Sequence, residues 1–398
     1  MPDLLPPARL GYVTASRVKG GVAAYTVVSS EDFATARAEI TAWPGYEPTP
    51  LVSLPALAQA IGIDEIRYKH EGPRFGLGSF KALGGAYAAL RVLQREIERL
   101  TGAEVSLSDI RNGRFAAECS EITLISATDG NHGRSLAWGC QRFGARCRIY
   151  IHTDVSEGRA QAMRNLGAEV IRIAGDYDAS VALAKGEAQE NGWFVVSDTS
   201  WPGYSQPPRE VMAGYGVMTQ EICDVLREAP THVFLQGGVG GLAAGVAASL
   251  RQHWGNTAPR VVIVEPELAA CLFESAKAGK PTTFVISRET IMAGLSCGEP
   301  SELAWTILEE EAGDYLTIPE NLVAPTMRLL ARPLGDDQVI EAGESAVAGL
   351  SALIAARADP DLSARLELDN GSRVLLIGSE GVTDPDIFAA IMEGRDAA

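Results

Sequence analysis

The feature that most constrains this chain is a repeated alternation of short apolar runs with longer helix-like stretches. Apolar runs that show no polar alternation indicate strands buried on both faces, and a parallel sheet covered by helices buries strands in that way. The sequence therefore predicts an α/β fold with two doubly wound parallel-sheet domains. The predicted strands lie at 122–126, 146–151, 168–173, 194–197, 231–235, 260–264 and 373–377.

The length of 398 residues exceeds what one hydrophobic core usually organises, so two domains are expected. We place the larger domain at 1–95 plus 205–398 and the smaller at 96–204. Residues 96–121 are polar and irregular, and we interpret them as an insertion in the smaller domain. The turn-rich segment 201–208 is a candidate for the return to the larger domain.

The net charge of the chain limits the kinds of molecule that it can bind. The chain has 34 Lys and Arg against 51 Asp and Glu, a net charge of −17, which argues against nucleic acid and anionic membranes. The N-terminus lacks a signal-peptide pattern, and the longest small-apolar run, 241–250, is too short to span a bilayer. The six cysteines are scattered and form no Cys/His cluster, so we expect a cytoplasmic protein without a metal site. Whether Cys271 and Cys297 pair is left open.

A glycine-rich loop follows the predicted strand 231–235. Its residues are Gln236, Gly237, Gly238, Val239, Gly240 and Gly241, and an alanine-rich helix comes next. Such a turn offers backbone N–H groups and the positive end of a helix to a phosphate. The loop also fits the dinucleotide pattern, with Glu265 in the place of a ribose-binding acid. By itself it leaves a pyridoxal phosphate site, a dinucleotide site and a structural turn open.

Two further segments bear on the choice. Lys81 stands at a helix start beside Phe80 and small residues, where partial desolvation lowers a lysine pKa as imine formation requires. An ordinary solvated helix lysine is the alternative. The loop after strand 122–126 carries Thr128, which can hold a carboxylate, and Asn131, which can bind a ring hydroxyl. We interpret His132 as a hydrogen-bonding residue rather than a proton shuttle, because no serine or cysteine nucleophile accompanies it.

These segments occur in the order found in the fold-type II enzymes that use pyridoxal 5'-phosphate, and the chain resembles that family. The matching blocks are Gly78–Lys81, Asp129–Gly133, Gln236–Gly241 and Gly378–Gly381. The resemblance implies a cofactor held between the two domains as a Schiff base on Lys81. It also implies a cofactor site that includes Phe80, Asn131 near the 3'-oxygen, Gly237, Gly238, Val239, Gly240 and Gly241 around the phosphate, and Ser379 at the ring nitrogen.

Two aspartates indicate which enzymes of this family the chain resembles most. Dehydratases typically have a serine-rich Ser-x-Gly-Asn-His loop, whereas this chain has Asp129 one residue before the glycine. A carboxylate there repels the substrate carboxylate unless the substrate brings a cation or a second base is needed. Asp198 follows the strand 194–197, so its loop opens on the same side of the sheet. Helix capping or a turn is the structural alternative for both. With the blocks 198–204, 212–216 and 292–300, the chain is similar to the diaminopropionate ammonia-lyases.

That similarity implies α,β-elimination of D- and L-2,3-diaminopropionate to pyruvate and two ammonia. Lys81, Asp129 and Asp198 are the expected catalytic residues, and Thr128, Asp129, His132 and Asp198 the expected substrate contacts. A homodimer is also implied. The alternatives are a serine/threonine or hydroxyaspartate ammonia-lyase, a non-catalytic relative that only binds the cofactor or an amino acid, and an NAD-dependent oxidoreductase.

Overall fold

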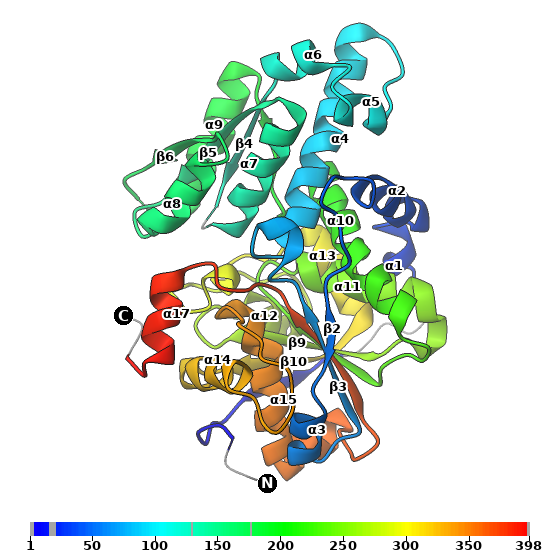
Figure 1. Ribbon diagram of the computed structural model, residues 1–398, viewed down its shortest axis with the longest axis vertical. Helices are drawn as coiled ribbons and strands as arrows, with labels where there is room; N and C mark the ends of the chain where they lie inside the picture. The colour runs from blue at the N-terminus through cyan, green and yellow to red at the C-terminus, as the bar shows by residue number, and fades with distance from the viewer. Residues whose placement is uncertain (1–3, 16–20, 129, 176, 396–398) are drawn as a thin grey trace. The chain divides into compact units, whose positions relative to one another are not determined.

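The computed structural model describes residues 4–15, 21–128, 130–175 and 177–395 (Figure 1). The chain divides into a first unit, Met1–Ser30, Pro48–Ser79 and Met218–Ala398, and a second unit, Glu31–Glu47 and Phe80–Val217. Unlike the predicted smaller domain, the second unit also includes Glu31–Glu47, residues 205–217 and the whole of the helix α4 (Lys81–Thr101). This helix packs along α7 (Asn131–Phe143) and so belongs to the second unit.

The first unit is built on a sheet with the order β1-β10-β9-β8-β11-β3-β2. Its inner strands run parallel, whereas β1 and β2 pair antiparallel at the two edges. The strands are β1 (Gly11–Thr14), β2 (Leu51–Ser53), β3 (Glu65–His70), β8 (His232–Gln236), β9 (Arg260–Pro266), β10 (Ala312–Ile318) and β11 (Arg373–Gly378). The helices are α1 (Ala23–Thr26), α3 (Pro55–Ile61), α11 (Gly241–Trp254), α12 (Cys271–Ala278), α13 (Glu302–Glu311), α14 (Val323–Ala331), α15 (Ala348–Ala358), α16 (Pro360–Leu366) and α17 (Pro385–Met392).

The second unit holds a parallel sheet with the order β6-β5-β4-β7. Its strands are β4 (Thr123–Ala127), β5 (Arg146–Ile151), β6 (Glu169–Arg172) and β7 (Phe194–Val195). Besides α4 and α7 its helices are α2 (Ser30–Ile40), α5 (Leu107–Arg111), α6 (Ala116–Glu121), α8 (Glu157–Arg164) and α9 (Tyr177–Asn191), and α10 (Gln206–Val225) runs on into the first unit.

The predicted α/β class and all seven predicted strands are confirmed, and four further strands appear. Strand β3 was not predicted, because its sequence Glu-Ile-Arg-Tyr-Lys-His alternates charged with apolar residues and lacks a continuous apolar run. Its Lys69 is buried nonetheless, since the ammonium donates to Glu221 and to the Thr49 carbonyl. A charged residue can therefore occupy an inner strand when a buried carboxylate pairs with it.

The prediction of an irregular segment at 96–121 is wrong. Helix α4 continues to Thr101, and the short helices α5 and α6 follow. The apolar stripe of α4 runs on through Leu93 and Ile97, both buried, so the polar residues between them do not end the helix. Within the described ranges no helix combines the length and the apolar composition that crossing a bilayer requires.

Candidate active site

The predicted site residues follow strand ends in both units. In the first unit β8 leads into the glycine loop and β11 into Ser379. In the second unit β4 leads to Thr128 and Asn131, and β7 to Asp198. Side chains at the carboxyl ends of parallel strands are where α/β proteins bind their ligands. Each unit therefore carries a share of the predicted site.

Lys81 and Asp198 form an ion pair in the second unit. The Lys81 ammonium, at the first residue of α4, donates to Asp198 Oδ2, and the two side chains are only 19% and 14% exposed. Burial acts to raise the pKa of Asp198, but the neighbouring ammonium outweighs it and holds that pKa well below its usual value. Asp198 is therefore a carboxylate that binds a primary ammonium.

Aromatic rings surround the lysine. Its Nζ lies 5.4 Å from the ring centroid of Phe80 and 5.9 Å from that of Tyr215, and these two rings pack 4.6 Å apart. Phe80 and Tyr215 are buried. Lys81 is thus partly desolvated, while its role in binding the cofactor remains a prediction. Tyr215 was not among the predicted site residues, although its position between Gly214 and Gly216 on a helix marks a place of close packing.

His132 lies beside Asp198. Its Nε2 is 2.8 Å from the Val196 carbonyl, and its Nδ1 is 4.0 Å from Asp198 Oδ2. Burial lowers the pKa of His132, so the ring is neutral near pH 7. Because a carbonyl only accepts, Nε2 carries the hydrogen and Nδ1 is the basic nitrogen. The ring therefore presents an acceptor to Asp198.

Thr128 precedes α7 and is held by backbone donors near the start of that helix. The Thr128 hydroxyl is buried and accepts from the Gly130 N–H at 3.1 Å and the Gly133 N–H at 3.3 Å. Asn131 begins α7 and is partly exposed. Asp129 lies outside the described residues. The expected contacts of Thr128, Asp129 and Asn131 with substrate or cofactor remain predictions.

The glycine loop is held by its carbonyl groups. The Gly237 carbonyl accepts from Gly240, the Gly238 carbonyl from the Cys271 thiol at 3.3 Å, and the Val239 carbonyl from Ser301 at 2.9 Å. Gly238 and Gly240 have φ angles of 63° and 95°, which favour glycine. The N–H groups that begin α11 have no partner within their own helix. This arrangement fits a phosphate group.

We predict that Gly237→Ala weakens binding of pyridoxal phosphate at least tenfold. A Cβ at this position would meet Glu265 Cγ at 2.4 Å, so the loop or the buried glutamate must move, a strain typically of about 1–3 kcal/mol. Fluorescence titration with pyridoxal phosphate measures the effect. Gly186→Ala, where a Cβ meets nothing within 4 Å, is the matched control. Equal affinities in the two variants would contradict the assignment of the loop.

Glu265 excludes the dinucleotide alternative. Its side chain is fully buried, and its carboxylate accepts from the backbone N–H groups of Leu272 and Phe273 at the start of α12. Burial raises the pKa of Glu265 to about 8, against those two hydrogen bonds. An acid engaged in this way is not available to a ribose. No disulfide joins Cys271 and Cys297.

Ser379 is buried directly after β11. Its neighbour Glu380 is engaged within the same unit, because the carboxylate accepts from the Ser345 N–H at 3.1 Å and the carbonyl from the Gly343 N–H at 3.2 Å. Of these two side chains, Ser379 is therefore the better candidate for the ring nitrogen. Its role remains a prediction.

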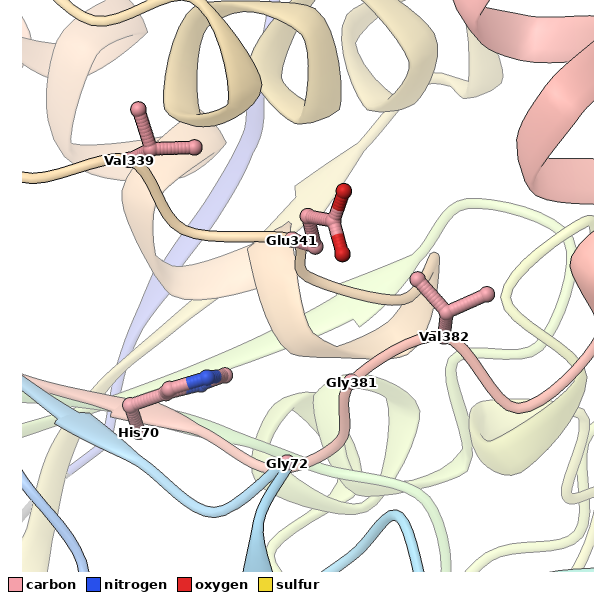
Figure 2. A pocket seen from close by; sticks show the side chains of 6 residues that line it. All are labelled: His70, Gly72, Val339, Glu341, Gly381 and Val382. Atoms are coloured by element: carbon pink, nitrogen blue, oxygen red, sulfur yellow. The ribbon is translucent and has the colours of Figure 1, made fainter.

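A pocket of about 400 Å³ lies in the first unit (Figure 2). His70 stands on one side of it and the Glu341 carboxylate on the other. Between them Gly72 and Gly381 pack backbone to backbone, since a Cβ on Gly381 would lie 3.0 Å from Gly72 Cα. Its lining residues are His70, Gly72, Val339, Glu341, Gly381 and Val382, none of which was predicted to bind the cofactor or the substrate.

Comparisons with known proteins agree with the predicted cofactor. A family model described as "Pyridoxal-phosphate dependent enzyme" matches residues 42–380. Diaminopropionate ammonia-lyase of Escherichia coli (strain K12) is 39% identical over 360 residues, which cover 89% of each chain. A crystal structure of the Escherichia coli enzyme with an aminoacrylate-PLP azomethine reaction intermediate has a TM-score of 0.88, at 34% identity and 98% coverage of both chains. Its complex with D-serine has a TM-score of 0.89, at 35% identity and 99% coverage of both.

Proposed function

The chain belongs to the family of pyridoxal-phosphate-dependent enzymes, and we propose that within it the protein acts as a diaminopropionate ammonia-lyase. The reaction removes ammonia from 2,3-diaminopropionate and yields pyruvate and a second ammonia. The observation that carries the proposal is the Lys81–Asp198 pair, in which a buried carboxylate already binds a primary ammonium. The distal amino group of the substrate is the same chemical group.

The residues that would hold the cofactor are divided between the two units. Lys81 would bind its aldehyde carbon and Asn131 its ring oxygen, Gly237–Gly241 its phosphate, and Ser379 its ring nitrogen. When bound, pyridoxal phosphate supplies an electron sink that stabilises negative charge at the substrate Cα. The carbonyl groups of Gly237, Gly238 and Val239, which are engaged by donors of the protein itself, support this fit.

Three residues of the chain would carry out the proton transfers. Lys81 removes the Cα proton on one face of the substrate, and Asp129 removes it on the other, which lets both isomers react. Asp198 holds the distal amine as an ammonium, because ammonia leaves Cβ only from the protonated form. These roles use one amine and two carboxylates, groups suited to such transfers.

Asp129→Asn is expected to lower turnover of the D isomer by about 10²–10⁴-fold, the usual effect of losing a general base. Turnover of the L isomer should change less than about tenfold, since Lys81 serves that face. Rates of pyruvate release from each isomer test this. Asp154→Asn is the control, because Asp154 is a 75% exposed carboxylate of the same unit. Equal losses on both isomers would rule out two bases.

The function itself is tested by a pyruvate assay on D- and L-diaminopropionate, serine, threonine and hydroxyaspartate side by side. We expect kcat/KM to be highest for diaminopropionate. A serine/threonine ammonia-lyase is the second candidate, because the Escherichia coli enzyme has been crystallised with D-serine. Higher kcat/KM for serine would favour that candidate, and no pyruvate from any substrate would contradict both. We also propose a cytoplasmic homodimer, on family resemblance alone.

A further inference from the structure

The imidazole of His132 faces the carboxylate of Asp198, although the ion pair between Lys81 and Asp198 does not require a histidine there. The Val196 carbonyl engages Nε2 of His132 and so directs Nδ1 toward Asp198 Oδ2 at 4.0 Å. Nδ1 is buried and receives no hydrogen bond among the described residues. Two acceptors that face each other in a buried site repel unless a proton lies between them.

We propose that His132 is a positioning residue for Asp198. When the Lys81 ammonium gives up a proton and Asp198 takes it up, the basic Nδ1 of His132 accepts a hydrogen bond from the protonated Asp198. The inference rests on the proposed role of Lys81 in binding the cofactor. It assigns to His132 a function in proton storage, beyond the hydrogen bond with Val196.

The proton balance requires such an acceptor. An ammonium is not a nucleophile, so Lys81 must lose one proton before its nitrogen can form a bond to an aldehyde carbon, with water as the leaving group. The existing hydrogen bond from Lys81 Nζ delivers that proton to Asp198 Oδ2. Without an ammonium beside it, a buried carboxylate is unfavourable, and the protonated acid is favoured.

The protonated acid then needs an acceptor. His132 Nδ1 is within reach, because a shift of about 1 Å turns the 4.0 Å separation into a hydrogen bond. The loop that carries Asp198 is held in place while this happens. The Tyr204 hydroxyl donates to the Val195 carbonyl and accepts from the Ser197 N–H, and the Tyr204 ring stacks on Trp201 at 4.0 Å.

The other titratable groups around the pair are less suitable. Burial raises the pKa of Tyr215, on α10, which keeps its hydroxyl neutral. Burial likewise raises the pKa of Tyr204, whose hydroxyl is already engaged. Lys81, on α4, is the proton donor in this step. Asp129 precedes α7, the helix that carries His132, but lies outside the described residues.

The direct test is ¹⁵N NMR of protein labelled at its five histidines, before and after loading with pyridoxal phosphate. His132→Gln removes one signal and so assigns it. We expect Nδ1 of His132 to lie in the range of an unprotonated nitrogen without cofactor and to move toward the protonated range on loading. This movement should vanish in Asp198→Asn. An unchanged Nδ1 signal in a protein that has acquired the visible band of lysine-bound pyridoxal would overturn the inference.

The pH profile of pyruvate release separates this role from a structural one. The hydrogen bond to Nδ1 stabilises protonated Asp198 and raises the apparent pKa of the pair. Because Asp198 must be a carboxylate to hold the distal ammonium, the acidic limb in His132→Gln, which can still donate to Val196, should move to lower pH by about one unit. His152→Gln, another buried histidine of this unit, should leave it in place. A uniform loss of rate without a shift would contradict the proposal, whereas a wild-type protein that forms no pyruvate would contradict the proposed function instead.

Discussion

Lys81→Ala is expected to abolish the visible absorbance that pyridoxal phosphate acquires on a lysine and to reduce pyruvate release by about 10⁴-fold, because in the proposed function one nitrogen would serve both as attachment point and as base. Absorbance spectra and single-turnover rates measure the two effects. Lys277→Ala, at an exposed lysine of α12, is the control and should retain both. A Lys81→Ala protein that kept the band would overturn the cofactor assignment.

The same substitution has a consequence for stability. Removing Lys81 leaves Asp198 as a buried carboxylate without its ammonium, which typically costs about 3–5 kcal/mol. The direction of the pH dependence follows from the lowered pKa of Asp198 in the folded protein. The stabilisation by the ion pair is fully present above the pKa that Asp198 has in the unfolded chain, and it is lost as the pH falls through the lower pKa of the folded state. Lys81→Ala should therefore lower the unfolding free energy at pH 7 more than at pH 3. Urea unfolding of cofactor-free protein at both pH values tests this, and the double variant with Asp198→Asn should recover much of the loss.

Asp198→Asn should discriminate between substrates. Asparagine keeps the size of the side chain but loses the charge that would hold the distal ammonium, a loss of about 3 kcal/mol or roughly a hundredfold in kcat/KM for diaminopropionate. Serine has no distal cation, so its kcat/KM should fall less than about tenfold. Both constants come from the pyruvate assay, with Asp154→Asn as the control. Equal losses on the two substrates would contradict an ammonium-binding role for Asp198.

The predictions that depended on local sequence agree best with the structure. Helix α4 begins at Lys81 and α11 at Gly241, as their glycine-flanked segments predicted. The strand patterns failed where long-range pairing overrides composition. In β3 Lys69 is neutralised by Glu221, which lies 152 residues away in sequence, and no local pattern encodes such a partner.

Glu265, next to the glycine loop, is a second residue whose role could not be predicted from local sequence. By sequence it stands where a ribose-binding acid belongs, and its backbone context at the end of β9 agrees with that interpretation. Only the fold shows that α12 begins over its carboxylate, so that two N–H groups engage it. The spacing of a motif predicts where a side chain begins, but burial decides what it can bind.

The sequence by itself determined the α/β class, the glycine loop and the position of Lys81 at a helix start, because periodicity and glycine act within a few residues. The tertiary structure alone decided that Lys81 pairs with Asp198, 117 residues away, and that a neutral His132 presents Nδ1 to the same carboxylate. Such contacts depend on how α4, α7 and the loop after β7 pack together. Electrostatic effects between buried groups change steeply over an ångström, so the chemistry of these three residues follows from packing.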